Sequence, residues 1–280
     1  MKHTRMAQRG VTLVELVVVL TIIGLIASLG ATLVARVVAT QQDNRGRLTL
    51  ALSADGASAR IADDLYAALP NSVRVVSNGG GVWIEWAPVL DAGRWRGAPD
   101  TVAASPGDVL DLTDASDNAF DIIGTPLALL AAGSQLVIQN LGTPEADAYA
   151  GNNRRAGLVL SAGGRHLSFT AAGALPNSTG TQRFFIVGTP LTVACTPAAG
   201  GGFEIVRYGG YGWLASQPAS SAAFVTATRT LLLGGLSACS AAYSSALANI
   251  GLVNLRWSVG TAGSSVKMDF MQQLAVDNTP

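Results

Sequence analysis

The chain has 280 residues, of which 49% are hydrophobic and 13% are charged. Basic and acidic side chains both total 18, so the charge balance argues against a nucleic-acid-binding protein. The length is sufficient for one β-rich domain, or two small ones, with a substantial hydrophobic core.

The first 35 residues combine a basic start with a long apolar run. Lys2, Arg5 and Arg9 precede the run, and Glu15 is the single charge between positions 11 and 35. As a helix, the uncharged residues 16–35 span about 30 Å, which is the thickness of a bilayer core. The sequence therefore predicts one membrane-spanning helix with its basic N-terminus in the cytoplasm.

The length of the apolar run and the presence of Glu15 argue against two common alternatives. A cleaved secretory signal has an apolar core of about 7–15 residues, and this run is longer. An ordinary membrane anchor leaves Glu15 unexplained, because a carboxylate at the centre of a spanning helix costs about 2.5–3.5 kcal/mol. Cleavage after Gly10 would create a positive α-amino group at Val11, four residues from this carboxylate.

The sequence QRGVTLVEL at positions 8–16 resembles the class III signal of type IV prepilins. The resemblance implies that a prepilin peptidase cuts after Gly10 on the cytoplasmic face and methylates the new terminus at Val11. It also implies that Glu15 neutralises the terminus of a neighbouring subunit during assembly. Phenylalanine is the commonest residue at the position of Val11, so we expect slower methylation here without loss of cleavage.

The helical pattern continues beyond the apolar run. Ile61, Leu65 and Leu69 recur at four-residue spacing, and Pro70 is incompatible with the interior of a helix. We therefore predict one helix over residues 11–69, with a membrane and polymerisation half at 11–35 and an amphipathic half that packs on a sheet. Gly24 and Gly30 are either flexible points of this helix or positions of close helix–helix packing.

Residues 70–280 are predicted to form a β-rich antiparallel head, which gives an α+β, type IV pilin-like fold with residues 1–10 as a leader. A hairpin is predicted at 72–76 and 82–86, because the intervening SNGGG favours a tight turn. An inserted lobe is predicted between about 88 and 133, where the chain is rich in Pro, Gly and Asp. Further strands are predicted at 135–139, 157–160, 166–170, 183–187, 191–195, 203–208, 252–259 and 266–271.

Two cysteines, Cys195 and Cys239, lie late in the chain. Outside the cytoplasm they are free to form a disulfide, which would stabilise the fold by roughly 4 kcal/mol in the chain-entropy model. The alternative is two buried free thiols.

An acidic cluster in a turn-rich segment is a candidate calcium site, and calcium is the one cofactor considered. Its spacing differs from that of an EF-hand loop, and turn formation is the alternative role for these side chains. The cluster comprises Asp108, Asp111, Asp114, Asp117 and Asp121.

Aromatic and arginine residues are a candidate ligand surface on the head, and the alternative role of the aromatic residues is packing in the core. They are Trp83, Trp86, Trp95, Arg94 and Arg96. No enzymatic activity is expected: His166 is the single histidine beyond the leader, and the chain has no nucleophile motif or P-loop.

Three later sequence segments resemble parts of MshO-type proteins from mannose-sensitive-haemagglutinin (MSHA) pilus systems. They are ALPNSVRV at 68–75, GRWR at 93–96 and VRYGGYG at 206–212. The resemblance implies a minor pilin of the inner membrane that later reaches the pilus and cell surface. Its implied partners are prepilin peptidase, other major and minor pilins, the inner-membrane assembly platform and the lipid bilayer. A type II secretion pseudopilin and a tip adhesin or binding module are the alternatives.

Overall fold

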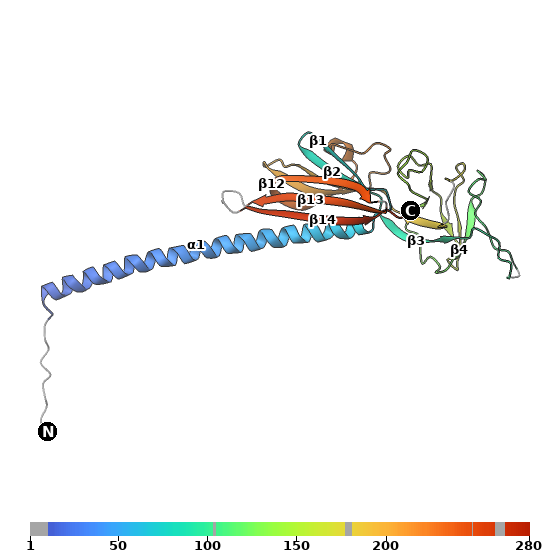
Figure 1. Cartoon of the computed structure of the whole chain (residues 1–280). Helices are drawn as coiled ribbons and strands as arrows, with labels where there is room; N and C mark the ends of the chain where they lie inside the picture. The colour runs from blue at the N-terminus through green and yellow to red at the C-terminus, as the bar shows by residue number, and fades with distance from the viewer. Residues whose placement is uncertain (1–10, 103–104, 177–180, 248, 261–266) are drawn as a thin grey trace, which may run out of the picture. The chain divides into compact units, whose positions relative to one another are not determined.

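A computed structural model describes residues 11–102, 105–176, 181–247, 249–260 and 267–280 (Figure 1). The fold is α+β, with one long N-terminal helix and two antiparallel seven-stranded sheets, as the sequence predicts. The chain divides after Thr49 into two compact units, which are described separately below. The structure thus groups the end of the helix, from Leu50, with the head.

Helix α1 extends over Leu13–Tyr66, close to the predicted range. Thr12 caps its start, and the chain leaves the helix shortly before Pro70. In the first unit, the hydroxyls of Thr21, Ser28 and Thr32 each donate to the carbonyl three residues earlier. The polar side chains of the apolar run therefore have internal partners, as a lipid environment requires.

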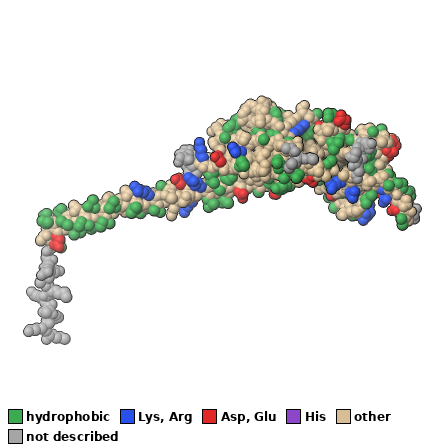
Figure 2. Space-filling view, viewed as in Figure 1, with side chains coloured by type: hydrophobic (Ala, Val, Ile, Leu, Met, Phe, Trp, Pro, Cys, Tyr) green, Lys and Arg blue, Asp and Glu red, His purple; other side chains and the backbone are tan. Residues whose placement is uncertain are grey.

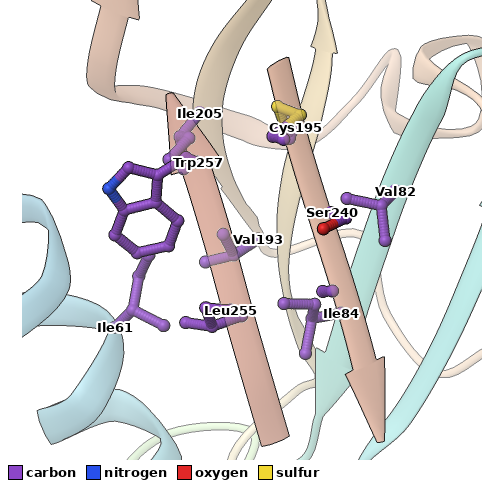
Figure 3. Close-up of a pocket in the computed structure, with 11 residues that line it drawn as sticks. Ile61, Val82, Ile84, Val193, Cys195, Ile205, Ser240, Leu255 and Trp257 are labelled. Atoms are coloured by element: carbon purple, nitrogen blue, oxygen red, sulfur yellow. A yellow bond between two sulfur atoms is a disulfide. The ribbon is translucent and has the colours of Figure 1, made fainter. Parts of the chain in front are cut away.

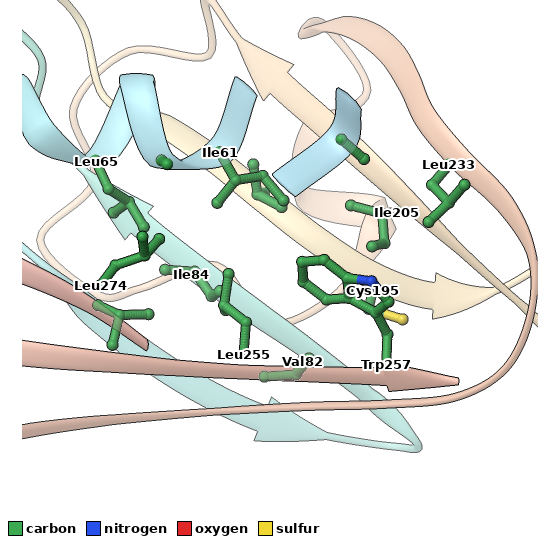
Figure 4. Packing of buried hydrophobic residues seen from close by; sticks show 14 of the residues in the cluster. Ile61, Leu65, Val82, Ile84, Cys195, Ile205, Leu233, Leu255, Trp257 and Leu274 are labelled. Atoms are coloured by element: carbon green, nitrogen blue, oxygen red, sulfur yellow. The ribbon is translucent and has the colours of Figure 1, made fainter. Parts of the chain in front are cut away.

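In the second unit, the last turns of α1 pack on the first sheet. The buried positions are one stripe of the helix, and they include Ala54, Ala57, Ile61 and Leu65. Figure 4 shows Ile61 and Leu65 above side chains of the sheet, among them Leu255 and Leu274. An ion pair between Asp64 of α1 and Arg207, at 2.7 Å, reinforces this contact.

The first sheet has the strand order β1-β2-β10-β11-β12-β13-β14. The predicted hairpin is confirmed: Asn78 pairs with Gly81, and Gly79 and Gly80 have φ values of 57° and 87°. Positive φ at both central residues defines a type I′ turn, which glycine adopts without steric cost. The strands are β1 (Arg74–Asn78), β2 (Gly81–Trp86), β10 (Leu191–Pro197), β11 (Phe203–Gly209), β12 (Thr228–Leu247), β13 (Ile250–Gly260) and β14 (Lys267–Asp277).

Strand β12 was not predicted, and it is the longest strand of the sheet. Its first half pairs with β11 and its second half pairs with β13, with irregular register between Leu236 and Ala238. Gly235, with φ of 73°, lies next to this irregularity. The change of partner lets one strand connect two parts of the sheet.

The second sheet has the order β6-β5-β9-β3-β4-β8-β7 and belongs to an insertion in the first. Trp86 at the end of β2 and Leu191 at the start of β10 are direct partners. Residues 87–190, here called the lobe, therefore leave and rejoin the first sheet at one point. The predicted end of the insertion, at residue 133, is wrong. Strands β5 to β9, which follow residue 133, belong to the same sheet as β3 and β4. The lobe strands are β3 (Val89–Trp95), β4 (Ala119–Ile123), β5 (Gln135–Ile138), β6 (Arg154–Arg155), β7 (Val159–Leu160), β8 (His166–Ser168) and β9 (Arg183–Val187).

Candidate assembly site

The N-terminus of α1 is organised by Thr12 and Glu15. The Thr12 hydroxyl accepts a hydrogen bond from the Glu15 backbone N–H at 3.3 Å, and its carbonyl accepts from the Leu16 N–H at 3.1 Å. Thr12 is thus the N-cap and Glu15 the third helical residue. The Thr-x-x-Glu spacing is the sequence signal from which this cap could have been predicted.

Glu15 is the acidic residue of the first helical turn, and it is exposed. A carboxylate at this position interacts favourably with the positive end of the helix dipole. Val11 is 69% exposed, one residue before the cap. Gly10 and the rest of the predicted leader lie outside the described residues. The structure thus presents Val11, the predicted first mature residue, and the carboxylate at the same end of one helix.

The apolar run presents hydrophobic side chains on all sides. The exposed ones include Leu16, Leu20, Ile23 and Leu33, and Figure 2 shows hydrophobic atoms along this segment. The helix is long and apolar enough to cross a bilayer, with a mean hydropathy of 2.6 in its most apolar window. A helix that is hydrophobic all round needs lipid or other helices as its surroundings.

Cys195 of β10 and Cys239 of β12 form a disulfide, with a Cα–Cα distance of 6.5 Å. The two strands are separated in the sheet by β11, so the bond joins strands that are not hydrogen-bonded neighbours. Figure 3 shows Cys195 at a small apolar cavity that is also lined by Ile61, Leu255 and Trp257. The disulfide therefore lies in the core between helix and sheet.

The acidic cluster forms turns. Asp111 accepts hydrogen bonds from the backbone and hydroxyl of Thr113, and Asp114 accepts the same pair from Ser116. These hydrogen bonds lower the pKa of both carboxyls. Asp117 accepts from the backbone N–H of Asp111 at 2.6 Å.

The candidate calcium ligands therefore do not converge. Within the part of the chain that the structure describes, no group of three or more acidic, histidine or cysteine side chains is arranged to hold a metal ion. Asp108 and Asp121 instead flank His166, whose Nδ1 is 3.7 Å and 3.0 Å from their carboxylate oxygens. Burial would raise the pKa of Asp121, but hydrogen bonds from the Asp108 amide and from His166 hold it below its usual value.

The candidate aromatic surface is not formed, and this interpretation is corrected. Trp83, Trp86 and Trp95 are all buried, and they belong to three separate hydrophobic clusters. Strands β2 and β3 place these side chains in cores because the aromatic rings carry the largest apolar area available to each cluster. Of the candidate ligand residues, Arg94 is exposed and Arg96 is partly exposed.

A buried polar network joins the lobe to the first sheet, and sequence reasoning missed it. Arg74 of β1 donates to the fully buried Glu85 at 2.5 Å, and Tyr211 donates to the same carboxylate at 2.7 Å. Burial raises the pKa of Glu85, and Arg74 offsets part of this rise. The Arg74 guanidinium also lies 3.6 Å from the centre of the Tyr149 ring, which belongs to the lobe.

Three asparagines form a second link at the end of α1. Asn71, with φ of 59°, donates to the carbonyls of Asn140 and Asn278. Asn140, in the lobe, donates in turn to the Pro70 carbonyl at 2.7 Å. The segments ALPNSVRV and VRYGGYG are linked through Glu85, which binds Arg74 of the first and Tyr211 of the second. Their hydrogen bonds connect positions up to 207 residues apart.

Comparison with known protein families gives one match. Residues 5–31 match the prokaryotic N-terminal methylation motif, which is the class III signal of type IV pilins. No curated protein and no solved structure matches the chain. The motif indicates a membrane-anchored, type IV pilin-like or pseudopilin protein that is processed by prepilin peptidase and assembles with other pilins.

Proposed function

We propose that this chain is a minor pilin of an MSHA-type pilus, cut after Gly10, N-methylated at Val11 and assembled through α1. The observation that carries the proposal is the position of Glu15. It lies in the first turn of an apolar helix, at the end that the matched motif covers and where we expect the new terminus.

The need of the Glu15 carboxylate for a cationic partner supports this role. Thr12 satisfies the backbone N–H of Glu15, so the cap needs only the threonine hydroxyl, and the exposed carboxylate is available to another group. In a bilayer, a carboxylate without a cationic partner is costly. An N-methylated α-ammonium group of an adjacent subunit supplies that cation where hydrophobic helices pack together.

The head supports a location outside the cytoplasm. A disulfide between Cys195 and Cys239 is typical of oxidising compartments. With the basic leader on the cytoplasmic face, the chain crosses the inner membrane once, and the head lies in the periplasm before pilus assembly. The large lobe fits a specialised, low-copy subunit of a pilus.

The proposal is tested by Glu15→Gln in the native host. We expect the variant to remain membrane-bound and to be cleaved, because the motif and the apolar run are intact. Its recovery in sheared surface filaments should fall about tenfold or more, since a charge-assisted contact is lost. Glu145→Gln removes an exposed carboxylate of the head and serves as the matched control.

Wild-type recovery of the Glu15 variant would remove the assembly role of this residue. Absence of the wild-type chain from surface filaments, together with a loss of protein secretion on deletion, would replace the pilus subunit with a type II secretion pseudopilin. Loss of attachment at unchanged pilus number would instead favour an adhesive role for the head.

A further inference from the structure

The lobe sheet has one face that is only partly covered. Phe184 and Ile186 of β9 point into the lobe core, while Phe185 and Arg183 lie on the opposite face. Near the first sheet this second face is covered by a cluster that includes Val137 and Trp213. At its far end, Arg183 is exposed.

Arg183 lies directly opposite Arg94 of β3. The Trp95 N–H donates to the Gln182 carbonyl at 2.9 Å, which makes the next pair along, Trp95 with Gln182, the hydrogen-bonded one. Arg94 and Arg183 are therefore a non-hydrogen-bonded pair, in which opposite side chains approach most closely, with Cα atoms about 4.5 Å apart. Like charges at such positions repel each other.

The side-chain carboxylates beside this pair are engaged by another arginine. On the same face, Arg96 forms ion pairs with Asp100 and Asp121, each at 3.8 Å. Neither Arg94 nor Arg183 forms an ion pair with any residue that the structure describes. Figure 2 shows basic side chains over the region of β3 and β4.

The surroundings of the pair are apolar and shallow. Ile123, the partner of Arg94 on β4, is 43% exposed. A hollow beside the two arginines is lined by Ala92 and Phe185. Arg94 also donates to the Thr181 carbonyl at 3.3 Å, which restrains its guanidinium. Two guanidinium groups thus face solvent next to an apolar floor.

We propose that Arg94 and Arg183 together bind an oxyanion, a carboxylate, sulfate or phosphate group of a ligand outside this chain. Each guanidinium offers paired N–H donors that match such a group, and one anion between the two cations relieves their repulsion. The apolar floor accommodates the carbon skeleton that carries the anion. The lobe is then a binding module on a subunit whose helix serves assembly.

The test is calorimetric titration of the full chain, in non-ionic detergent at low ionic strength, with inorganic phosphate and with dextran sulfate. Phosphate binding would identify a site for small anions, and binding of dextran sulfate alone would identify a site for anionic polymers. In either case, Arg94→Gln and Arg183→Gln should each raise the Kd about tenfold. Arg165→Gln removes one exposed arginine of the same lobe and should change the Kd less than about twofold.

A stability measurement gives a second readout. Both variants should fold, because each removes an exposed charge from a repulsive pair. The anion should raise the Tm of the wild type and leave that of the Arg94→Gln/Arg183→Gln double variant unchanged. Absence of binding to both probes, or an equal loss in Arg165→Gln, would overturn the proposal. Self-association that both variants abolish, without anion binding, would overturn it in favour of a contact with a second copy.

Discussion

The first sheet and the lobe both contain seven antiparallel strands, but they acquire their cores differently. The first sheet uses α1 to cover its apolar face, through residues such as Ile61 and Leu65. The lobe has short strands and buries its own aromatic cluster, including Phe120, Phe169 and Phe184. The core of the first sheet therefore includes residues of α1 and the disulfide, whereas the described lobe core includes neither.

The comparison indicates a division of roles within one head. The lobe enters and leaves at the paired residues Trp86 and Leu191, and a small apolar cluster that includes Leu69 and Val137 joins it to the rest. An insertion at one point of a sheet can vary without changing the helix-packing face. Under the two proposals above, assembly would belong to the helix and first sheet, and recognition to the lobe.

The largest expected effect comes from removing the lobe. Replacing residues 87–190 with Asn-Gly joins β2 and β10 as a hairpin. Leu69→Ser is added because Leu69 loses its apolar partners and would otherwise expose a hydrophobic side chain. We expect the disulfide and the helical content to persist, and the denaturant m-value to fall by roughly two fifths with the buried surface. A shortened chain that cannot form the disulfide would show that the first sheet requires the lobe.

Removing the disulfide should act on the first sheet alone. Cys195→Ser with Cys239→Ser should lower the free energy of unfolding by about 4 kcal/mol, because the unfolded chain loses a constraint on a 44-residue separation. Hydrogen exchange should become faster in β12 and stay unchanged in β4 and β8. Equal acceleration in the lobe would contradict the independence of the two cores.

Arg74→Met should destabilise the junction of the two regions by about 3 kcal/mol at neutral pH, because it leaves Glu85 buried without its cation. The folded pKa of Glu85 is already above 4.5, the value of a free glutamate, so its contribution to stability is fully present below that pH. The contribution is lost as the pH rises through the folded pKa. Denaturation at about pH 4 and pH 7 should therefore show the larger defect at pH 7.

Glu85→Gln provides the control for this prediction. Added to Arg74→Met, it removes the buried charge, so the double variant should regain part of the lost stability at neutral pH and none at acidic pH. If the double variant were as unstable as Arg74→Met at both pH values, the defect would come from packing rather than from charge.

The smallest effect is expected on the helix itself. A Cβ added at Gly56 meets no atom within 4 Å, so Gly56→Ala should stabilise the head by about 0.5–1 kcal/mol. Ala59→Gly, at another exposed position of the same helix, should destabilise it by a similar amount. Thermal denaturation shows whether each substitution raises or lowers the Tm. A lower Tm for Gly56→Ala would indicate that the end of the helix packs differently.

Local sequence signals predicted the helix and the first hairpin because each depends on neighbouring residues. Strand β12 could not be predicted in this way, since Gly234, Gly235 and its many alanines and serines have low β propensity. It is a strand because β11 and β13 provide hydrogen-bonding partners on both sides. The extent of the lobe was missed for the same reason, since β9 pairs with β3 across about ninety residues.

The candidate assembly site shows the same limit. Glu15 was identifiable as a charge in an apolar run, and the Thr12 cap was readable from its spacing. The Arg74–Glu85–Tyr211 network was not, because Tyr211 joins the hairpin across 126 residues. Acidic residues in turns and in metal sites have similar local sequences, so the roles of Asp111 and Asp114 required the three-dimensional arrangement.

The central claim is that this chain enters the prepilin pathway, and its most direct test is the intact mass and N-terminal sequence of membrane-extracted protein. The chain should be expressed with and without a prepilin peptidase. The account predicts loss of residues 1–10 and a methyl group on Val11 only when the peptidase is present. An uncut chain, or a cut elsewhere, would leave Glu15 without a terminus to neutralise and would contradict the account.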